Sequence, residues 1–281
     1  MAIPAYAGTL ERTWYYTFRL FCAAVFIFLI APILVIVPLS FNAEPYFSFT
    51  EGMLTLDPEA YSLRWYEEFL TSDRWIESIK NSVIIAFFAT ILSAVLGTLA
   101  ALGLNRSELP FKGVIMGLLI SPMIVPLIIA AAGMFFFYSK LGIAQSYVGL
   151  ILAHTALGTP FVVITVTATL SGFDHTLIKA GASLGATPTY TFFKVTMPLI
   201  MTGVISGALF AMMTSFDEVI VAIFIAGVEQ RTIPLQMWSG IREQISPTIL
   251  AVATILITFS IIMLTTVEIL RRRSDRIRGI S

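Results

Sequence analysis

Residues 82–104 read SVIIAFFATILSAVLGTLAALGL and contain no charged side chain. A helix that crosses the hydrocarbon core of a bilayer needs about 20 mostly apolar residues, so this stretch predicts a transmembrane helix. The whole chain has the same character, because 57% of its 281 residues are hydrophobic and only 12% are charged. A soluble domain carries about 25% charged residues. This composition excludes a disordered protein, a nucleic-acid-binding protein and an ordinary soluble enzyme.

Apolar stretches of similar length recur on both sides of this one. Together they predict an all-α integral membrane protein with six transmembrane helices. The expected spans are residues 18–41, 82–104, 114–137, 147–170, 199–226 and 247–270. Two glycine pairs, Gly113/Gly117 and Gly203/Gly207, have the four-residue spacing that lets helix backbones approach closely. Glycine is also simply common in membrane helices, so both interpretations of the pairs stay open.

The distribution of Lys and Arg predicts the orientation of the chain. Six spans put both termini and the loops 105–112 and 171–198 on one side. This side carries about twice as many Lys and Arg residues as the other, although the two sets of segments are similar in length. Both termini are therefore expected in the cytoplasm. The tail contains Arg271, Arg272, Arg273, Arg276 and Arg278, which suit an anionic lipid surface.

Three parts of the chain follow from this pattern. Residues 1–76 are an N-terminal part with the first span and an external amphipathic segment, residues 77–270 are the main membrane domain, and residues 271–281 are the basic cytoplasmic tail. The external residues 42–80 mix aromatic and acidic side chains, which is typical of helices lying at the membrane surface. A shorter external loop, residues 227–246, contains Trp238 and a break at Pro234.

The cytoplasmic loop 171–198 contains the signals for two short helices joined at a corner. Asp174 or Thr176 is expected to cap the first helix, which continues to about Leu184. Gly185 then fits the left-handed position that follows a helix C-terminus. Thr187 and the proline after it suit the start of a second helix, because proline is favoured at the first helical position.

This loop has features of a docking element. Pro198 is expected at the start of the fifth span, because proline lacks a backbone N–H. The small residues 180–182 give the first helix a flat face that suits a groove in another protein. The alternative interpretation is a loop that merely connects two spans.

The loop resembles the "EAA" loop of the membrane subunits of type I ABC importers. That family pattern is Glu-Ala-Ala, three residues, Gly-Ala and a segment ending in proline. The matching positions here are Lys179, Ala180, Gly181, Leu184, Gly185, Ala186 and Pro198. The resemblance covers roughly residues 77–270 and implies the type I ABC importer transmembrane fold. Lys179 stands where the family has glutamate, and Gly181 where it has the second alanine.

The resemblance implies that these loop residues couple the chain to a separate ATPase. This chain has no Gly-x-x-x-x-Gly-Lys-Ser/Thr motif, so it lacks the phosphate-binding loop that ATP hydrolysis needs. The chain is therefore expected to be non-catalytic, with no cofactor of its own, and with ATP and Mg²⁺ bound by the partner. The implied partners are an ATPase dimer, a second permease subunit, an extracytoplasmic solute-binding protein and membrane lipid.

Asp217 and Glu218 lie inside the expected fifth span, together with Thr214. A charged residue near the bilayer centre costs about 2.5–3.5 kcal/mol, so two adjacent acids suggest a function. They are expected to line a path for a cationic solute. Two different interpretations stay open: the acids pair with Arg231, Arg242 or a partner chain as structural contacts, or they lie at the membrane surface.

Several separate blocks look like the spermidine/putrescine permease subunits within this family. These blocks are residues 61–66, 215–218, 232–242 and 246–254. The resemblance implies a multi-pass bacterial inner-membrane permease for a small cationic solute, namely a polyamine, with Trp238 as a candidate cation–π contact. The same architecture would also suit another small solute, such as an amino-acid derivative. A channel or carrier that works without ATP also stays open, whereas an intramembrane enzyme would need a nucleophile–base pair or metal ligands inside the spans.

Histidine and cysteine are too scarce for a metal site or a nucleophile–base pair. The chain has one cysteine, Cys22, and two histidines, His154 and His175. His154 lies within the fourth expected span and is predicted to form a hydrogen bond between helices rather than to relay protons. No metal-binding and no catalytic residue is therefore assigned.

Overall fold

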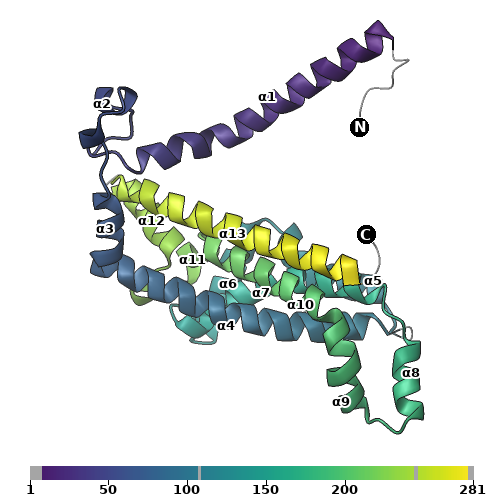
Figure 1. Cartoon of the computed structure of the whole chain (residues 1–281). Coiled ribbons are helices and arrows are strands. Elements are labelled where there is room, and N and C mark those ends of the chain that lie inside the picture. The colour runs from purple at the N-terminus through teal and green to yellow at the C-terminus, as the bar shows by residue number, and fades with distance from the viewer. Residues whose placement is uncertain (1–7, 107–108, 244–245, 278–281) are drawn as a thin grey trace. The chain divides into compact units, whose positions relative to one another are not determined.

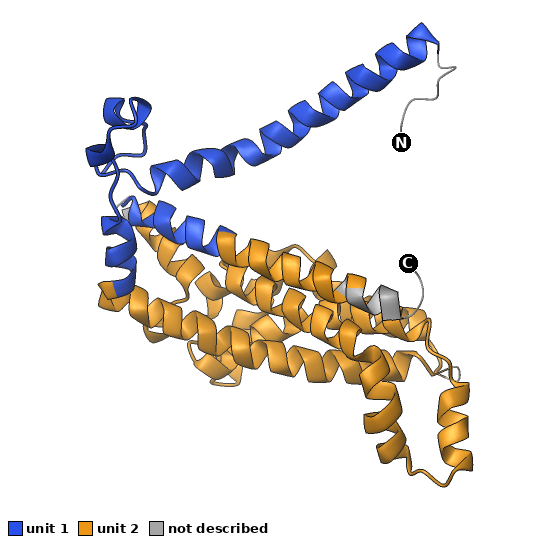
Figure 2. Cartoon of the chain, in the orientation of Figure 1, with its two compact units in different colours: residues 1–70, 245–257 blue, residues 71–244, 258–281 orange. Residues whose placement is uncertain are grey.

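A computed structural model describes residues 8–106, 109–243 and 246–277 of the chain. In these residues the regular elements are helices, apart from an isolated antiparallel bridge between Asn42 and Tyr61. The chain divides into two compact units, residues 1–70 with 245–257 and residues 71–244 with 258–281 (Figure 2). Of the basic tail, Arg278 lies outside the described residues.

The elements follow one another along the chain with short connections. In order they are α1 (Thr9–Leu39), α2 (Glu51–Leu54), η1 (Pro58–Ala60), α3 (Arg64–Thr71), α4 (Asp73–Leu104), α5 (Lys112–Ile124), α6 (Leu127–Lys140), α7 (Tyr147–Leu170), α8 (Thr176–Ser183), α9 (Pro188–Thr191), the π-helical turn η2 (Phe192–Thr196), α10 (Met197–Asp217), α11 (Ile220–Ile225), η3 (Val228–Gln230), α12 (Ile233–Glu243) and α13 (Thr248–Ile277).

Five of the described helices are long and apolar enough to cross a membrane: α1, α4, α7, the continuous helix Pro188–Asp217 and α13. The third predicted span, residues 114–137, is wrong as a continuous helix, because α5 and α6 meet at an angle of 102°. Val125 has an extended backbone (φ −67°, ψ 135°), as expected for a residue before proline, and Pro126 starts the new direction. The pair is one broken span or a re-entrant loop, so the cytoplasmic location of both termini stays a prediction.

The fifth predicted span, residues 199–226, is wrong at both ends. Its helix begins at Pro188 instead of near Leu199, and it ends at Asp217. Glu218 then takes an extended conformation (φ −76°, ψ 115°), and the short helix α11 follows as a separate element. The second span also starts earlier than predicted, because α4 begins at Asp73.

Asn42, which is fully buried, joins several segments of the first unit. Its Nδ2 donates hydrogen bonds to the carbonyls of Tyr46 (3.2 Å) and Ser48 (3.1 Å), and its own carbonyl accepts from the indole N–H of Trp65 at 2.8 Å. The segment before Trp65 is therefore a compact loop. Amphipathic helices were predicted over residues 42–80. Before α4 begins, α3 is the one described helix in this range that is longer than a single turn.

The core of the second unit is made by α4, α7 and α10, which run side by side (Figure 1). Glycines allow the close approach of these helices. A Cβ on Gly97 would lie 2.6 Å from Cβ of Val162, and one on Gly207 would lie 2.7 Å from Cα of the same valine. The close-packing interpretation of the Gly203/Gly207 pair is thus confirmed. A Cβ on Gly113 or Gly117 would meet nothing within 4 Å, so that pair makes no such contact in this chain.

Replacing Gly207 with leucine is expected to prevent α10 from packing on α7. The new side chain would meet the backbone of α7, which cannot move aside as a flexible side chain can. The loss of folding free energy should therefore be larger than in an ordinary overfilled core, where it is about 1–3 kcal/mol. Most of the monodisperse protein should be lost on size-exclusion chromatography after detergent extraction. Gly117→Leu is the matched control and should give a normal yield. Equal yields for the two variants would contradict the packing argument.

Candidate functional site

A hydrogen-bonded acid lies just before helix α8. Asp174 Oδ1 accepts from the backbone N–H of Thr176 at 2.8 Å, and Asp174 Oδ2 accepts from the hydroxyl of Thr176 at 2.7 Å. These two bonds, the backbone one first, lower the pKa of the Asp174 carboxyl below its ordinary value. The N-cap position itself is His175, which makes no side-chain cap bond, so the prediction that Asp174 or Thr176 caps the helix is wrong by one residue, and Asp174 instead holds the turn just before the helix.

Helix α8 ends at the glycine corner that the sequence predicts. Gly185 has φ +79°, in the left-handed region. Its N–H donates to the carbonyl of Ala182 at 3.0 Å, and the N–H of Ala186 donates to the carbonyl of Gly181 at 3.0 Å. This pair of bonds is the Schellman motif, which satisfies the last carbonyls of a helix and turns the chain sharply. The helix ends at Ser183, close to the predicted end.

The second arm of the loop starts as predicted but does not stop before the fifth span. Thr187 Oγ1 accepts from the N–H of Tyr190 at 3.3 Å, and Pro188 occupies the first turn of α9. The helix then continues through the π-helical turn η2 into α10, where Pro198 lies in the first turn. Pro198 has no N–H for the usual bond to the carbonyl of Lys194, and the helix accommodates it next to the wider π turn.

The loop is therefore rigidly joined to a membrane helix. The continuous helix Pro188–Asp217 has 30 residues, and at 1.5 Å per residue it is about 45 Å long. One end carries the glycine corner, and the other end carries the acidic pair. Figure 1 shows α8 and α9 projecting together from the end of the α4–α7–α10 core.

The two arms of the loop pack on each other through Gly181. A Cβ on Gly181 would lie 3.1 Å from the hydroxyl of Thr191, so the absence of a side chain lets α8 lie against α9. Ala182 lines a pocket on the same inner side. Two residues of the predicted flat face 180–182 therefore face inward, namely Gly181 toward α9 and Ala182 toward the pocket. The most exposed large apolar side chains of the loop are Leu184 (88% exposed), Tyr190 (59%) and Phe193 (61%).

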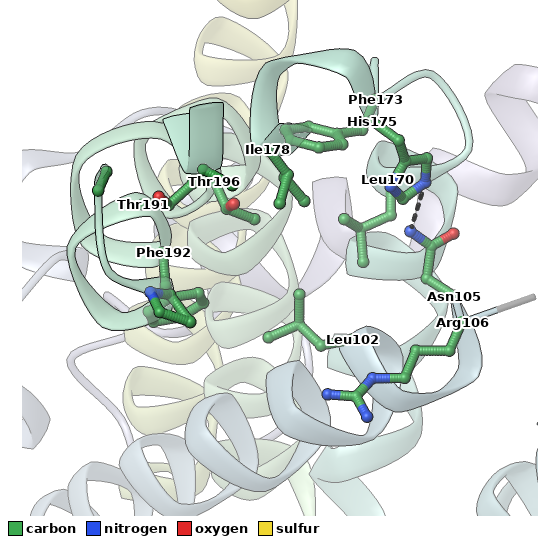
Figure 3. A pocket seen from close by; sticks show the side chains of 13 residues that line it. Leu102, Asn105, Arg106, Leu170, Phe173, His175, Ile178, Thr191, Phe192 and Thr196 are labelled. Carbon is green, nitrogen blue, oxygen red and sulfur yellow. Dashed lines mark hydrogen bonds between the residues drawn. The ribbon is translucent and has the colours of Figure 1, made fainter. Parts of the chain in front are cut away.

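A pocket of about 640 Å³ lies between the loop and the end of the helical core (Figure 3). Its walls come from the last turns of α4 and α7, from α8, and from the helix that starts at Pro188. The lining residues are Leu102, Asn105, Arg106, Leu170, Phe173, His175, Ile178, Ala182, Ala186, Pro188, Thr191, Phe192 and Thr196. Asn105 Nδ2 and His175 Nε2 lie 3.3 Å apart and form a hydrogen bond across the pocket rim. Lys179 is exposed and does not line the pocket.

The two predicted path acids have different environments. Asp217 is the last residue of α10, and its side chain is exposed. Glu218 is only 7% exposed, and its Oε1 accepts from the N–H of Val221 at 2.8 Å, so it caps the start of α11. Neither acid forms an ion pair with a described residue, which means that the alternative pairing with Arg231 or Arg242 is not found in this part of the chain.

The other two predicted path residues form no hydrogen bond with the acids among the described residues. Thr214 donates its hydroxyl to the carbonyl of Phe210 at 3.0 Å, within its own helix. Trp238 is 45% exposed on α12, a helix that contacts α10. Among the described residues no hydrogen bond or ring contact joins Trp238 to Asp217. Pro234 does not break the external loop as predicted, because it lies in the first turn of α12.

His154 forms the predicted bond between helices. It is 1% exposed on α7, and its Nδ1 lies 2.7 Å from the hydroxyl of Ser215 on α10. Ser215 lies two positions before Asp217, so this bond fixes the end of α10 just before the break. The described residues contain no cluster of three or more His, Cys, Asp or Glu side chains that would hold a metal ion.

A buried amide that the sequence analysis missed holds the segment after α11. Asn81 Nδ2 donates to the carbonyls of Glu229 (2.8 Å) and Arg231 (2.9 Å), and its Oδ1 accepts from the hydroxyl of Tyr147 at 2.6 Å. The neighbouring Ser82 accepts from the N–H of Ile233 at 2.8 Å. Two polar residues at the start of an otherwise apolar run were the available signal, and they tie the start of α12 to α4.

Comparison with known proteins assigns this architecture to a transport family. Residues 93–276 match the family described as "Binding-protein-dependent transport system inner membrane component". The chain is 31% identical to the spermidine/putrescine transport system permease protein PotC of Haemophilus influenzae over 255 residues, which cover 91% of this chain and 96% of the relative. It is 31% identical to the putrescine transport system permease protein PotI of Escherichia coli K12 over 240 residues, covering 83% and 82%.

Solved structures share the fold at low sequence identity. A chain of a bacterial ABC transporter involved in the import of the acidic polysaccharide alginate superposes with a TM-score of 0.71. The match covers 95% of this chain and 99% of the other, at 15% identity. At this level the likeness concerns the fold alone.

Proposed function

We propose that this chain, which belongs to the family of inner-membrane components of binding-protein-dependent transport systems, forms half of the solute path of an ATP-driven polyamine importer. The chain is a multi-pass bacterial inner-membrane protein and an ABC permease subunit. The observation that carries the proposal is the continuous helix Pro188–Asp217, which connects a docking loop directly to an acidic break in the membrane region.

The loop α8–α9 is the proposed contact with the ATPase. Its corner is fixed by the Schellman motif at Gly185, and it exposes the large apolar side chains of Leu184 and Tyr190. A groove in the ATPase would bury these side chains. Because α9 continues into α10, a displacement of the loop moves α10 as a rigid body, the type of element that couples distant sites. Lys179, at the family's glutamate position, would contact an acidic group of the ATPase where that glutamate would contact a basic one.

The proposed solute is a small polyamine such as putrescine or spermidine. PotC and PotI, the relatives named above, are permeases for these solutes by their names. The exposed carboxylate of Asp217 would attract an ammonium group, and the end of α10 adds the negative end of the helix dipole. Thr214 and the ring of Trp238 are the further candidates along the path.

The chain needs partners to complete this function. A second permease subunit would supply the other half of the path, an ATPase dimer would bind ATP and Mg²⁺, and an extracytoplasmic binding protein would deliver the solute. The external candidates for that delivery are residues 42–80 and 227–246. A second candidate function is import of another small solute, because the same fold occurs in a transporter for an acidic polysaccharide, and so the fold does not determine the charge of the cargo.

Uptake competition tests the proposed solute. Cells or proteoliposomes with the complete importer should take up labelled putrescine only with ATP, and excess spermidine should compete while an uncharged amino-acid derivative should not. Affinity purification of the chain from membranes should recover an ATPase and a second permease. Uphill uptake without ATP would contradict the importer, and competition by the derivative alone would contradict the polyamine.

A further inference from the structure

We propose that the pocket beneath the coupling loop binds an anionic phospholipid, with the phosphate at Arg106 and an acyl chain along the apolar wall. The effect on coupling described below rests on the proposed function, whereas binding of the lipid does not. The pocket of about 640 Å³ is in the size range of small-molecule sites, and it belongs entirely to the second compact unit.

The charge of the pocket favours an anion. Arg106 lines it and forms no ion pair with a described residue, and none of the lining residues is Asp or Glu. The neighbouring acid, Asp174, does not line the pocket, and its carboxylate oxygens accept hydrogen bonds from Thr176. Figure 3 shows the Arg106 side chain extending along the pocket below Leu102, apart from the hydrogen-bonded pair of Asn105 and His175. The planar guanidinium of an arginine donates paired hydrogen bonds that match the oxygens of a phosphate group.

The remaining walls favour a lipid over a free anion. Apart from Thr191 and Thr196 they are apolar, and they include Leu102, Leu170, Ile178 and Phe192. Leu102 and Leu170 lie in the last turns of two membrane-spanning helices, α4 and α7, where a bilayer changes from acyl chains to headgroups. A soluble phosphate would leave this surface uncovered, whereas a phospholipid of the ATPase-side leaflet presents both of its parts at this depth.

A bound lipid would support the loop. In the chain by itself α8 packs on α9 and on the π turn η2, through contacts such as Gly181 with Thr191. A lipid in the pocket would add contacts from α8 through Ile178 to the ends of α4 and α7. The loop would then transmit force to the core along both arms, and anionic lipid would increase the ATPase activity of the assembled importer.

Lipid exchange in the complete importer tests this site. The importer is placed in nanodiscs of phosphatidylcholine alone or of phosphatidylcholine with phosphatidylglycerol, and both retained lipid (native mass spectrometry) and ATPase rate are measured. We expect phosphatidylglycerol to be retained and to raise the rate, and Arg106→Gln to weaken retention about fivefold. Lys112→Gln removes a cation from the same loop outside the pocket and should change neither.

The outcomes separate the possible explanations. Unchanged retention in Arg106→Gln, or an equal loss in Lys112→Gln, overturns the site. Stimulation by glycerol phosphate in phosphatidylcholine nanodiscs, equal to that by phosphatidylglycerol, shows a soluble anion and overturns the lipid. If no ATPase copurifies, retention by the purified chain still tests the pocket, so failure of the importer assignment is distinguishable from failure of the site.

Discussion

Replacing Gly185 with valine is expected to lower solute uptake and binding-protein-stimulated ATP hydrolysis about tenfold or more. Gly185 has φ +79°, a conformation that costs an ordinary residue about 1–2 kcal/mol and a β-branched residue more. Valine would therefore favour a different backbone, break the Schellman motif and turn the exposed tip with Leu184 away from its present direction. Since 1.4 kcal/mol corresponds to a factor of ten, a modest backbone penalty is enough to depopulate the docking geometry.

The change acts through the backbone alone, which makes it a sharp test. A Cβ at Gly185 would meet no atom within 4 Å, so valine creates no clash in the core, and expression and thermal stability in detergent should stay normal. Gly185→Asn is the matched control, because asparagine tolerates the left-handed region, and it should retain most of the uptake. If valine and asparagine behave alike, the geometry of the corner does not matter for coupling.

The features that the sequence predicted are those set by neighbouring residues. The corner at Gly185 and the start at Thr187–Pro188 follow from the conformational preferences of glycine and proline, which hold in almost any context. Most of the apolar runs predicted membrane helices for a similar reason, since about 20 apolar residues in succession are long enough to cross a bilayer as a helix. These predictions needed no knowledge of what packs against the residues.

The features that the sequence did not predict depend on tertiary context. Pro126 and Pro198 both lie in apolar helical sequence, yet the chain bends by 102° near the first and continues as a helix through the second. A proline removes one hydrogen bond in both cases, and the surrounding helices decide whether the chain bends. Asn81 bonds to carbonyls 148 and 150 residues away, and the pocket joins four separate elements, so no local pattern contains either.

The structure gives the two acids of the predicted path different roles. Asp217 and Glu218 are equivalent in sequence, but only Asp217 is exposed, whereas the Glu218 carboxylate is buried as the cap of α11. The side chain that faces away from the core is the one that a passing cation can reach. The buried carboxylate shapes the break that holds Asp217 in place.

Replacing Asp217 with asparagine is therefore expected to lower uptake of a polyamine about tenfold, while assembly with the ATPase stays intact. Asparagine keeps the size of the side chain and removes the charge, and loss of an attraction to an ammonium group worth about 1.4 kcal/mol gives this factor. Glu218→Gln should cause a smaller loss, because the amide oxygen of glutamine can still accept from the N–H of Val221. Glu218→Leu should lower thermal stability, since that N–H would then be buried without an acceptor.

The measurement is labelled putrescine uptake in proteoliposomes, with the amount of copurified ATPase as the readout for assembly. Ser215→Ala is a useful comparison, because it removes the bond to His154 near the break without changing the charge at Asp217. It should change uptake less than Asp217→Asn does if charge, rather than the rigidity of the helix end, governs passage. Full uptake by both Asp217→Asn and the double variant Asp217→Asn/Glu218→Gln would show that the acids have only a structural role, and the solute path would then have to lie elsewhere in the bundle.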